Sequence, residues 1–252
     1  MMRTANPALN NKTFEGFGYA APAHSMTLMG TVHKTGLLLL FTLLSASWVW
    51  GKFFSAGDPA SGAQAVAVWT MVGAIGGLVA ALVTAFKKEW AGKTAPVYAL
   101  LEGLFLGGLS AMFEARFSGI VIQAVSLTFG TLFCLLLAYR SGLIKATENF
   151  KLGVFAATGA IGVFYLVTWI LGMFHVNMGM MMGSGLLSIG LSVFIVIIAA
   201  LNLVLDFDFI EKGAESGAPK YMEWYAAFGL MVTLIWLYVE ILRLLSKLRG
   251  RN

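Results

Sequence analysis

The chain has 252 residues, of which 59% are hydrophobic and 12% charged, and its formal net charge is +5. Soluble domains carry about 25% charged residues, so this composition, with a mean hydropathy of +0.82, excludes an ordinary soluble domain and indicates an integral membrane protein. The single Cys134 excludes an intrachain disulfide, and no Cys/His cluster has the spacing of metal ligands. We therefore expect no metal site and no cofactor.

Seven apolar segments approach or reach the length of about 20 residues that crosses a bilayer. In chain order they are residues 35–50, 63–86, 96–113, 118–139, 152–174, 182–206 and 222–245. They predict an all-α membrane protein with seven transmembrane helices, of which the third is interrupted by Glu102. Residues 1–30 are expected to form a polar N-terminal tail, and 31–252 a single transmembrane domain.

The basic residues predict the orientation of these spans. Eleven of the seventeen Lys and Arg residues lie in the N-terminal segment or in the loops after spans two, four and six, against six on the other side. Because cytoplasmic loops are enriched in Lys and Arg, we expect a cytoplasmic N-terminus. The basic tail from Arg243 to Arg251 then lies outside. The basic residues are spread over short loops and a tail, so the bilayer is the expected partner and nucleic acid is not.

Small residues at four-residue spacing predict close helix packing. Gly103 and Gly107 form a GxxxG pair in the third span, a pattern that favours close approach of two backbones.

The segment NLVLDFDFIEKG, residues 202–213, carries three carboxylates at the end of a long apolar run. Ionisable residues inside spans are candidates for function. Asp206 follows LNLVL and is the deepest, and Asn202 lies one turn before it on the same helical face. Asp208 is rotated by about 200° from Asp206. For Asp208 and Glu211 the sequence favours polar residues that close the helix at the lipid headgroups.

Three further carboxylates lie in or next to the spans, at Glu102, Glu223 and Glu240. Glu102 is either a hydrogen-bonded group that joins helices or a site for a proton or cation. Thr233 and Glu240 share one face of the seventh span, where small and polar residues suit the centre of a bundle. For Glu240 a local ion pair with Arg243 is the alternative to a functional role.

Catalytic motifs are missing from the sequence. MGSG around Ser184 lacks the leading Gly of a serine intramembrane protease, and Asp206 and Asp208 lie on one helix without a GxGD-type motif. No Walker A motif and no dinucleotide-binding fingerprint is present. We therefore expect that the protein is not an enzyme.

Four stretches together resemble the bacterial branch of the Bax inhibitor-1-like family of integral membrane proteins. They are NPALNNKTF, MTLMGTVHKTGLLLL, APVYALLEGLFLGGLS and the C-terminal third from LNLVLDFDFIEKG to EILRLL. The resemblance covers nearly the whole chain. It implies a bacterial inner membrane, and a fold in which six helices surround a central C-terminal helix. It also implies either a pH-sensitive cation leak, usually for calcium, or a modulator of stress and proteolysis.

In relatives a pair of Asp residues, one ending the sixth span and one in the seventh, senses pH, and such a pair titrates together. Asp206 resembles the first partner, while Thr233 occupies the place of the second. Glu240, Glu223 or Glu102 are the candidate substitutes. Relatives also latch the sixth-span Asp with a basic residue at the end of the second span, which corresponds here to Lys87 or Lys88.

These observations predict a calcium or other cation leak, gated when Asp206 is protonated. The gate includes Asp208, Thr233 and Glu240, with Glu102, Asn202 and Glu223 as candidate positions along a cation or proton path. The alternative is a non-transporting protein that binds a membrane protease or another helix bundle in a stress response.

Overall fold

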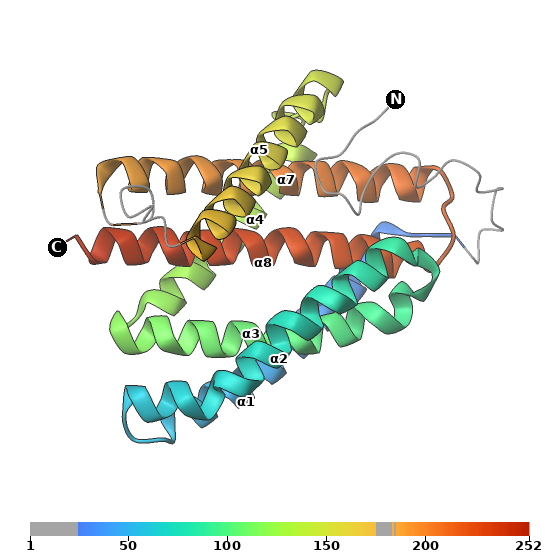
Figure 1. Ribbon diagram of the computed structural model, residues 1–252. Helices are drawn as coiled ribbons and strands as arrows, with labels where there is room; N and C mark the ends of the chain where they lie inside the picture. The colour runs from blue at the N-terminus through green and yellow to red at the C-terminus, as the bar shows by residue number, and fades with distance from the viewer. Residues whose placement is uncertain (1–24, 175–182, 184, 252) are drawn as a thin grey trace. The chain divides into compact units, whose positions relative to one another are not determined.

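The computed structural model describes residues 25–174, 183 and 185–251. Within these residues, seven helices are long and apolar enough to cross a membrane, and the only β structure is an isolated bridge between Ser25 and Pro219 (Figure 1). The predicted all-α membrane fold is therefore confirmed. Residues 1–24 of the predicted tail, and residues 182 and 184 of the sixth predicted span, lie outside the described residues.

Six of the seven helices are longer than the predicted spans, and α4 is about as long as predicted. They are α1 (Leu28–Phe54), α2 (Pro59–Phe86), α3 (Ala91–Arg116, after the short 3₁₀ helix η3, Lys88–Trp90), α4 (Ile120–Arg140), α5 (Glu148–Met173), α7 (Leu186–Glu215) and α8 (Met222–Arg249). The largest shift at a single helix end is at the C-terminus of α7, which was predicted at 206 and lies at Glu215. Helical backbone continues past the apolar run because a helix satisfies its own hydrogen bonds in water as well as in lipid.

Side-chain caps and turn residues explain several helix boundaries. Thr27 caps α1 by accepting the Gly30 amide, and Asp58 caps α2 by accepting the amides of Ala60 and Ser61. Such caps satisfy amide groups that have no partner within the helix. In the turn between α1 and α2, Gly57 has φ +86°, a conformation that glycine adopts without steric cost.

The chain divides into two compact units. Of the described residues, the α1–α3 unit comprises 25–121 and 209–232, and the α4–α7 unit comprises 122–174, 183, 185–208 and 233–251. Helices α7 and α8 each contribute a segment to both units. The prediction of a single domain over 31–252 stays a prediction.

In the α1–α3 unit, α3 packs against both α1 and α2 through glycines. A Cβ atom on Gly103 would lie 1.9 Å from Ser45 Oγ and 2.4 Å from the Thr42 carbonyl oxygen of α1. On α2, a Cβ on Gly73 would lie 2.5 Å from the Phe105 amide nitrogen of α3. The close packing that the GxxxG pair predicts is therefore confirmed for α3, and glycines on α2 add to it.

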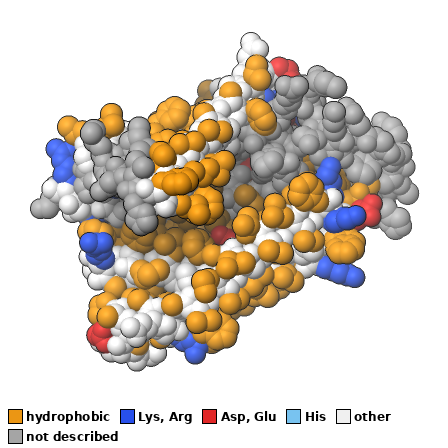
Figure 2. Space-filling view, viewed as in Figure 1, with side chains coloured by type: hydrophobic (Ala, Val, Ile, Leu, Met, Phe, Trp, Pro, Cys, Tyr) orange, Lys and Arg blue, Asp and Glu red, His pale blue; other side chains and the backbone are white. Residues whose placement is uncertain are grey.

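Much of the helical surface is apolar and exposed, as lipid contact requires. Figure 2 shows hydrophobic side chains over much of the face that it draws, with few charged side chains among them. In α7 and in α8, half of the residues in the most apolar 18-residue stretch of the helix are buried. In α1 and α2 the corresponding share is 22%. The two C-terminal spans are thus the most enclosed, while the placement of α8 at the centre of six helices rests on the family resemblance.

The glycine contacts give a direct test of the α1–α3 packing. We expect Gly103→Ala to destabilise the protein by about 1–3 kcal/mol, because an added methyl group would overlap α1. The thermal unfolding midpoint in detergent measures this. The matched control is Gly36→Ala on α1, where a Cβ meets no atom within 4 Å. Equal midpoints for the two variants would contradict the packing.

Candidate functional site

Helices α5 and α7 pack antiparallel within the α4–α7 unit and carry a row of polar contacts. Successive contacts pair Lys151 with Asp208, Val154 with Leu205, Thr158 with Asn202, and Ile161 with Ile198. Polar and apolar pairs alternate along this α5–α7 seam. It therefore places two of the predicted site residues, Asn202 and Asp208, against the same neighbouring helix.

The polar end of the seam is an ion pair that the sequence analysis missed. Lys151 Nζ lies 3.0 Å from Asp208 Oδ2 and 3.3 Å from Glu148 Oε1, and the lysine side chain is 1% exposed. A buried ammonium is costly unless it is paired. Lys151 looks like a loop lysine in the sequence because it closely follows a polar segment. Its one detectable signal is that an apolar run begins immediately after it.

Asp206 and Asp208 lie inside α7 and not at its end. Helix α7 continues to Glu215, so the prediction that Asp208 closes the helix at the lipid headgroups is wrong, while for Glu211, which is exposed one turn before the helix end, it stays a prediction. Asp206 is completely buried and Asp208 is 8% exposed. The Lys151 ammonium of α5 stabilises the Asp208 carboxylate in this buried position.

Asn202 is also held within the seam. Its amide donates to Thr158 Oγ1 at 2.9 Å and to the Ile198 carbonyl oxygen at 2.8 Å. Interhelical bonds of this kind join transmembrane helices. Asn202 thus links α5 to α7 one turn before Asp206, and its place on a cation path stays a prediction.

Glu240 of α8 forms the local ion pair that was the alternative to a functional role. Arg243 Nη1 donates to Glu240 Oε1 at 3.0 Å and to Oε2 at 3.1 Å. Tyr165 of α5 donates its hydroxyl to Glu240 Oε1 at 2.8 Å. Thr233, on the same helix, is buried. These contacts satisfy the Glu240 carboxylate, and a role in the gate for Glu240 or Thr233 stays a prediction.

In the α1–α3 unit, Glu223 is a hub that joins the start of α8 to the start of α1. The carboxylate is completely buried. It accepts the Thr27 amide at 2.9 Å and the Thr27 hydroxyl at 2.8 Å. Lys220 Nζ lies 2.9 Å away, and Lys34 also forms an ion pair with it. Glu223 therefore has the contacts of a structural ion pair, and a place on the cation path stays a prediction.

Backbone groups near Glu223 also help to join the start of α8 to the start of α1. A Cβ on Gly30 would lie 2.2 Å from Glu223 Oε1, so only glycine leaves room for the carboxylate. Ahead of α1, the Met26 amide donates to the Ala218 carbonyl oxygen at 2.6 Å. The segment that enters α1 is thus bound to the connection between α7 and α8.

Glu102 and the two candidate latch lysines also lie in the α1–α3 unit. Glu102 is partly buried and rests against α2, where a Cβ on Gly77 would lie 2.7 Å from its Oε2. Lys87 is the C-cap of α2, and Lys88 Nζ lies 5.8 Å from the ring centroid of Tyr225. Asp206 belongs to the other unit, so a latch between it and Lys87 or Lys88 stays a prediction.

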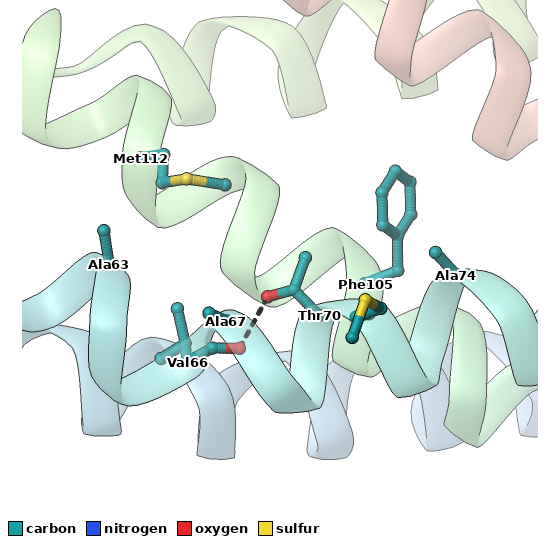
Figure 3. A pocket seen from close by; sticks show the side chains of 8 residues that line it. Ala63, Val66, Ala67, Thr70, Ala74, Phe105 and Met112 are labelled. Atoms are coloured by element: carbon teal, nitrogen blue, oxygen red, sulfur yellow. Dashed lines mark hydrogen bonds between the residues drawn. The ribbon is translucent and has the colours of Figure 1, made fainter.

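A cavity of about 270 Å³ between α2 and α3 offers no site for a cation (Figure 3). Its lining includes Ala67, Met71, Phe105 and Met112. The hydroxyl of Thr70, which also lines it, donates to the Val66 carbonyl oxygen at 2.9 Å. Among the described residues, no group of three or more His, Cys, Asp or Glu side chains is placed to hold a metal ion.

Because the Glu223 carboxylate joins several groups, removal of its charge should lower the stability of the protein. We expect Glu223→Gln to cost about 3 kcal/mol, because it leaves the largely buried Lys34 ammonium without its carboxylate. Thermal unfolding in detergent measures the change. Glu215→Gln is the control, since it removes one exposed carboxylate at the end of α7. A Glu223→Gln variant as stable as this control would refute the role of the hub.

Comparison with known proteins agrees with the sequence resemblance. No curated protein and no solved structure matches the chain significantly. The model of the family described as Bax inhibitor 1 like matches residues 6–250, which is nearly the whole chain. Together with seven helices that are apolar enough to cross a membrane, this match shows that the chain belongs to the Bax inhibitor 1 like family of membrane proteins.

Proposed function

We propose that the protein is a pH-sensitive cation leak, with calcium as the principal ion, gated by protonation of Asp206. The observation that carries the proposal is a completely buried Asp206 in the interior of a helix that is apolar enough to span a membrane. A carboxylate in that position is costly and is a candidate for function by default. The role is not enzymatic and needs no cofactor.

The proposed gate changes charge with pH. Ionised Asp206 attracts cations and pairs with Lys87 or Lys88, and protonation removes the charge and weakens the pair. Thr233 occupies the place of a second carboxylate, so the gate has one principal titrating group, and Asp208 and Glu240 take part in it as carboxylates paired with Lys151 and Arg243. Asn202, Glu102 and Glu223 supply oxygens for the path. An ion pair contributes about 0–1 kcal/mol when it is exposed and more when it is partly dry, which suffices for a modest bias between open and closed states.

The proposed location is a bacterial inner membrane with the N-terminus in the cytoplasm. The excess of Lys and Arg on the N-terminal side of the spans supports this orientation. The end of α2, the start of α5 and the end of α7 then face the cytoplasm. Asp206 would therefore respond to cytoplasmic pH.

Calcium flux into dye-loaded proteoliposomes between pH 6 and 8 tests the proposal. We expect wild-type flux to vary with pH by about five-fold, the factor that corresponds to an ion pair of about 1 kcal/mol. Asp206→Asn carries no titrating group at this position, so its flux should no longer vary with pH. The matched control is Glu211→Gln, which removes an exposed carboxylate from the same helix. Its flux should have the pH profile of the wild type.

An unchanged pH profile in Asp206→Asn would rule out this residue as the gate. If folded wild-type protein carries no flux at any pH, the leak itself is refuted. The alternative is then a non-transporting modulator that binds a membrane protease or another membrane protein.

A further inference from the structure

Glu102 is a partly buried carboxylate in the middle part of α3. At 1.5 Å per residue it lies about 16 Å from the start of that helix and about 21 Å from its end. Among the described residues, Glu102 has no basic residue and no hydrogen-bond donor as a partner, whereas Asp208, Glu223 and Glu240 each pair with a basic residue. An ionised Glu102 therefore needs a positive charge from a ligand, because an apolar environment does not stabilise a lone carboxylate.

The cavity between α2 and α3 ends beside this carboxylate. Phe105 and Ala74 line the cavity at one end, as Figure 3 shows. Glu102 lies three residues before Phe105 on α3. Gly77 lies three residues after Ala74 on α2, and a Cβ on it would lie 2.7 Å from Glu102 Oε2. Because residues three apart are neighbours on one face of a helix, the Glu102 carboxylate lies about one turn beyond this end of the cavity.

The cavity has the dimensions of a groove for one hydrocarbon chain. It extends along α2 from Ala63 to Ala74, which is about 16 Å, and its volume is about 270 Å³. The mean cross-section is therefore about 16 Å², which is about the area that a chain needs when its carbon atoms pack about 4 Å from their neighbours. The lining carries no charge, and the hydroxyl of Thr70 already donates to the Val66 carbonyl oxygen. The groove thus suits an apolar chain and not a charged group.

Several residues that line the groove are exposed, so a ligand is able to enter it from the side. These residues include Ala67, Met71, Ala74 and Met112. Methionine side chains are unbranched and flexible, and they adapt to ligands of different shape. The groove is therefore accessible without separation of α2 from α3, whose backbones are held together by glycine contacts.

We propose that Glu102 and this groove bind a long-chain primary amine, with its ammonium on the Glu102 carboxylate and its chain between α2 and α3. The hydrocarbon core of a bilayer is about 30 Å thick and excludes headgroups, so the amine of a phospholipid does not reach the middle of α3. A neutral single-chain amine dissolves in hydrocarbon and does reach it. The proton of the neutral Glu102 acid then passes to the amine nitrogen, which leaves a carboxylate and an ammonium in contact.

Equilibrium binding of radiolabelled dodecylamine to the purified full-length protein in detergent tests the site. We expect saturable binding to the wild type. Glu102→Gln keeps the size of the side chain but removes its charge, so the affinity should fall by about ten-fold. Dodecanol has the same chain without an ammonium, and butylamine has the ammonium without the chain. Each should compete for the site at least about ten-fold less well than unlabelled dodecylamine.

The groove is tested separately by Ala67→Leu, which places a larger side chain in the lining. The affinity should fall by about ten-fold, as for the exclusion of about two methylene groups of the ligand. Ala65→Leu is the matched control, since Ala65 is also exposed on α2 but does not line the cavity. Glu89→Gln removes an exposed carboxylate of η3 and is the control for the charge. Both controls should bind dodecylamine as the wild type does.

Weaker binding in Glu102→Gln and in Ala67→Leu, with wild-type affinity in both controls, supports the site. It is overturned if the wild type shows no saturable binding, if either of these two variants binds as tightly as the wild type, or if dodecanol competes as well as dodecylamine. Should Glu102→Gln fail to fold, Ala67→Leu and the competition by dodecanol decide between the same outcomes.

This site goes beyond the proposed leak, which concerns inorganic cations and Asp206. The binding experiment measures no flux, so absence of dodecylamine binding leaves the leak standing. Conversely, a protein that binds dodecylamine but carries no calcium flux retains the site and loses the leak.

Discussion

A carboxylate buried among apolar helices must be held by a positive charge or by hydrogen-bond donors, since neither lipid nor the packed interior can solvate it. Three carboxylates in this protein meet that requirement with basic residues. Asp208 pairs with Lys151, Glu223 with Lys34 and Lys220, and Glu240 with Arg243. Two of the pairs join separate helices, so the requirement for charge balance also fixes which helix surfaces lie together within each unit.

The same requirement explains how the packing of small residues and the ion pairs depend on each other. Glu223 reaches the start of α1 only because Gly30 has no side chain. Glu102 rests against α2 only because Gly77 is a glycine. In both places a missing side chain provides the volume that a carboxylate occupies. Glycine in these helices therefore has two structural roles: it leaves space for a carboxylate, and it allows the backbones of α1, α2 and α3 to approach closely.

The ion pairs also separate structural carboxylates from those that remain candidates for gating. Glu223 has two lysines and the capped end of α1 around it, so a permeant cation would have to displace several donors. Asp208 pairs with the buried ammonium of Lys151 from α5, and the proposed gate places a change between two states in this α5–α7 seam and not at the Glu223 hub. Asp206, one turn after the Asn202 bond, lies on the helix that such a change would release.

The sequence by itself determined the membrane class, the seven spans and the residues at which charge enters them. Apolar run length is a local property, and the cost of charge in hydrocarbon makes residues such as Asp206, Glu102 and Glu223 conspicuous without any structure. The family resemblance carried the same information over the whole chain. The sequence did not predict where α7 ends beyond Asp206, because a helix can continue into water where no apolar run marks it.

Only the tertiary structure decided which charges on different helices meet, whereas the local pair of Glu240 with Arg243 could be predicted from their spacing. Lys151 and Asp208 are far apart in sequence, and they become partners because α5 and α7 run antiparallel in a register set by Thr158 with Asn202 and by the isoleucines beyond. Lys34 likewise reaches Glu223 only because α1 and α8 begin at the same place in their unit. Pairing of this kind depends on packing between helices, which no local pattern of residues encodes.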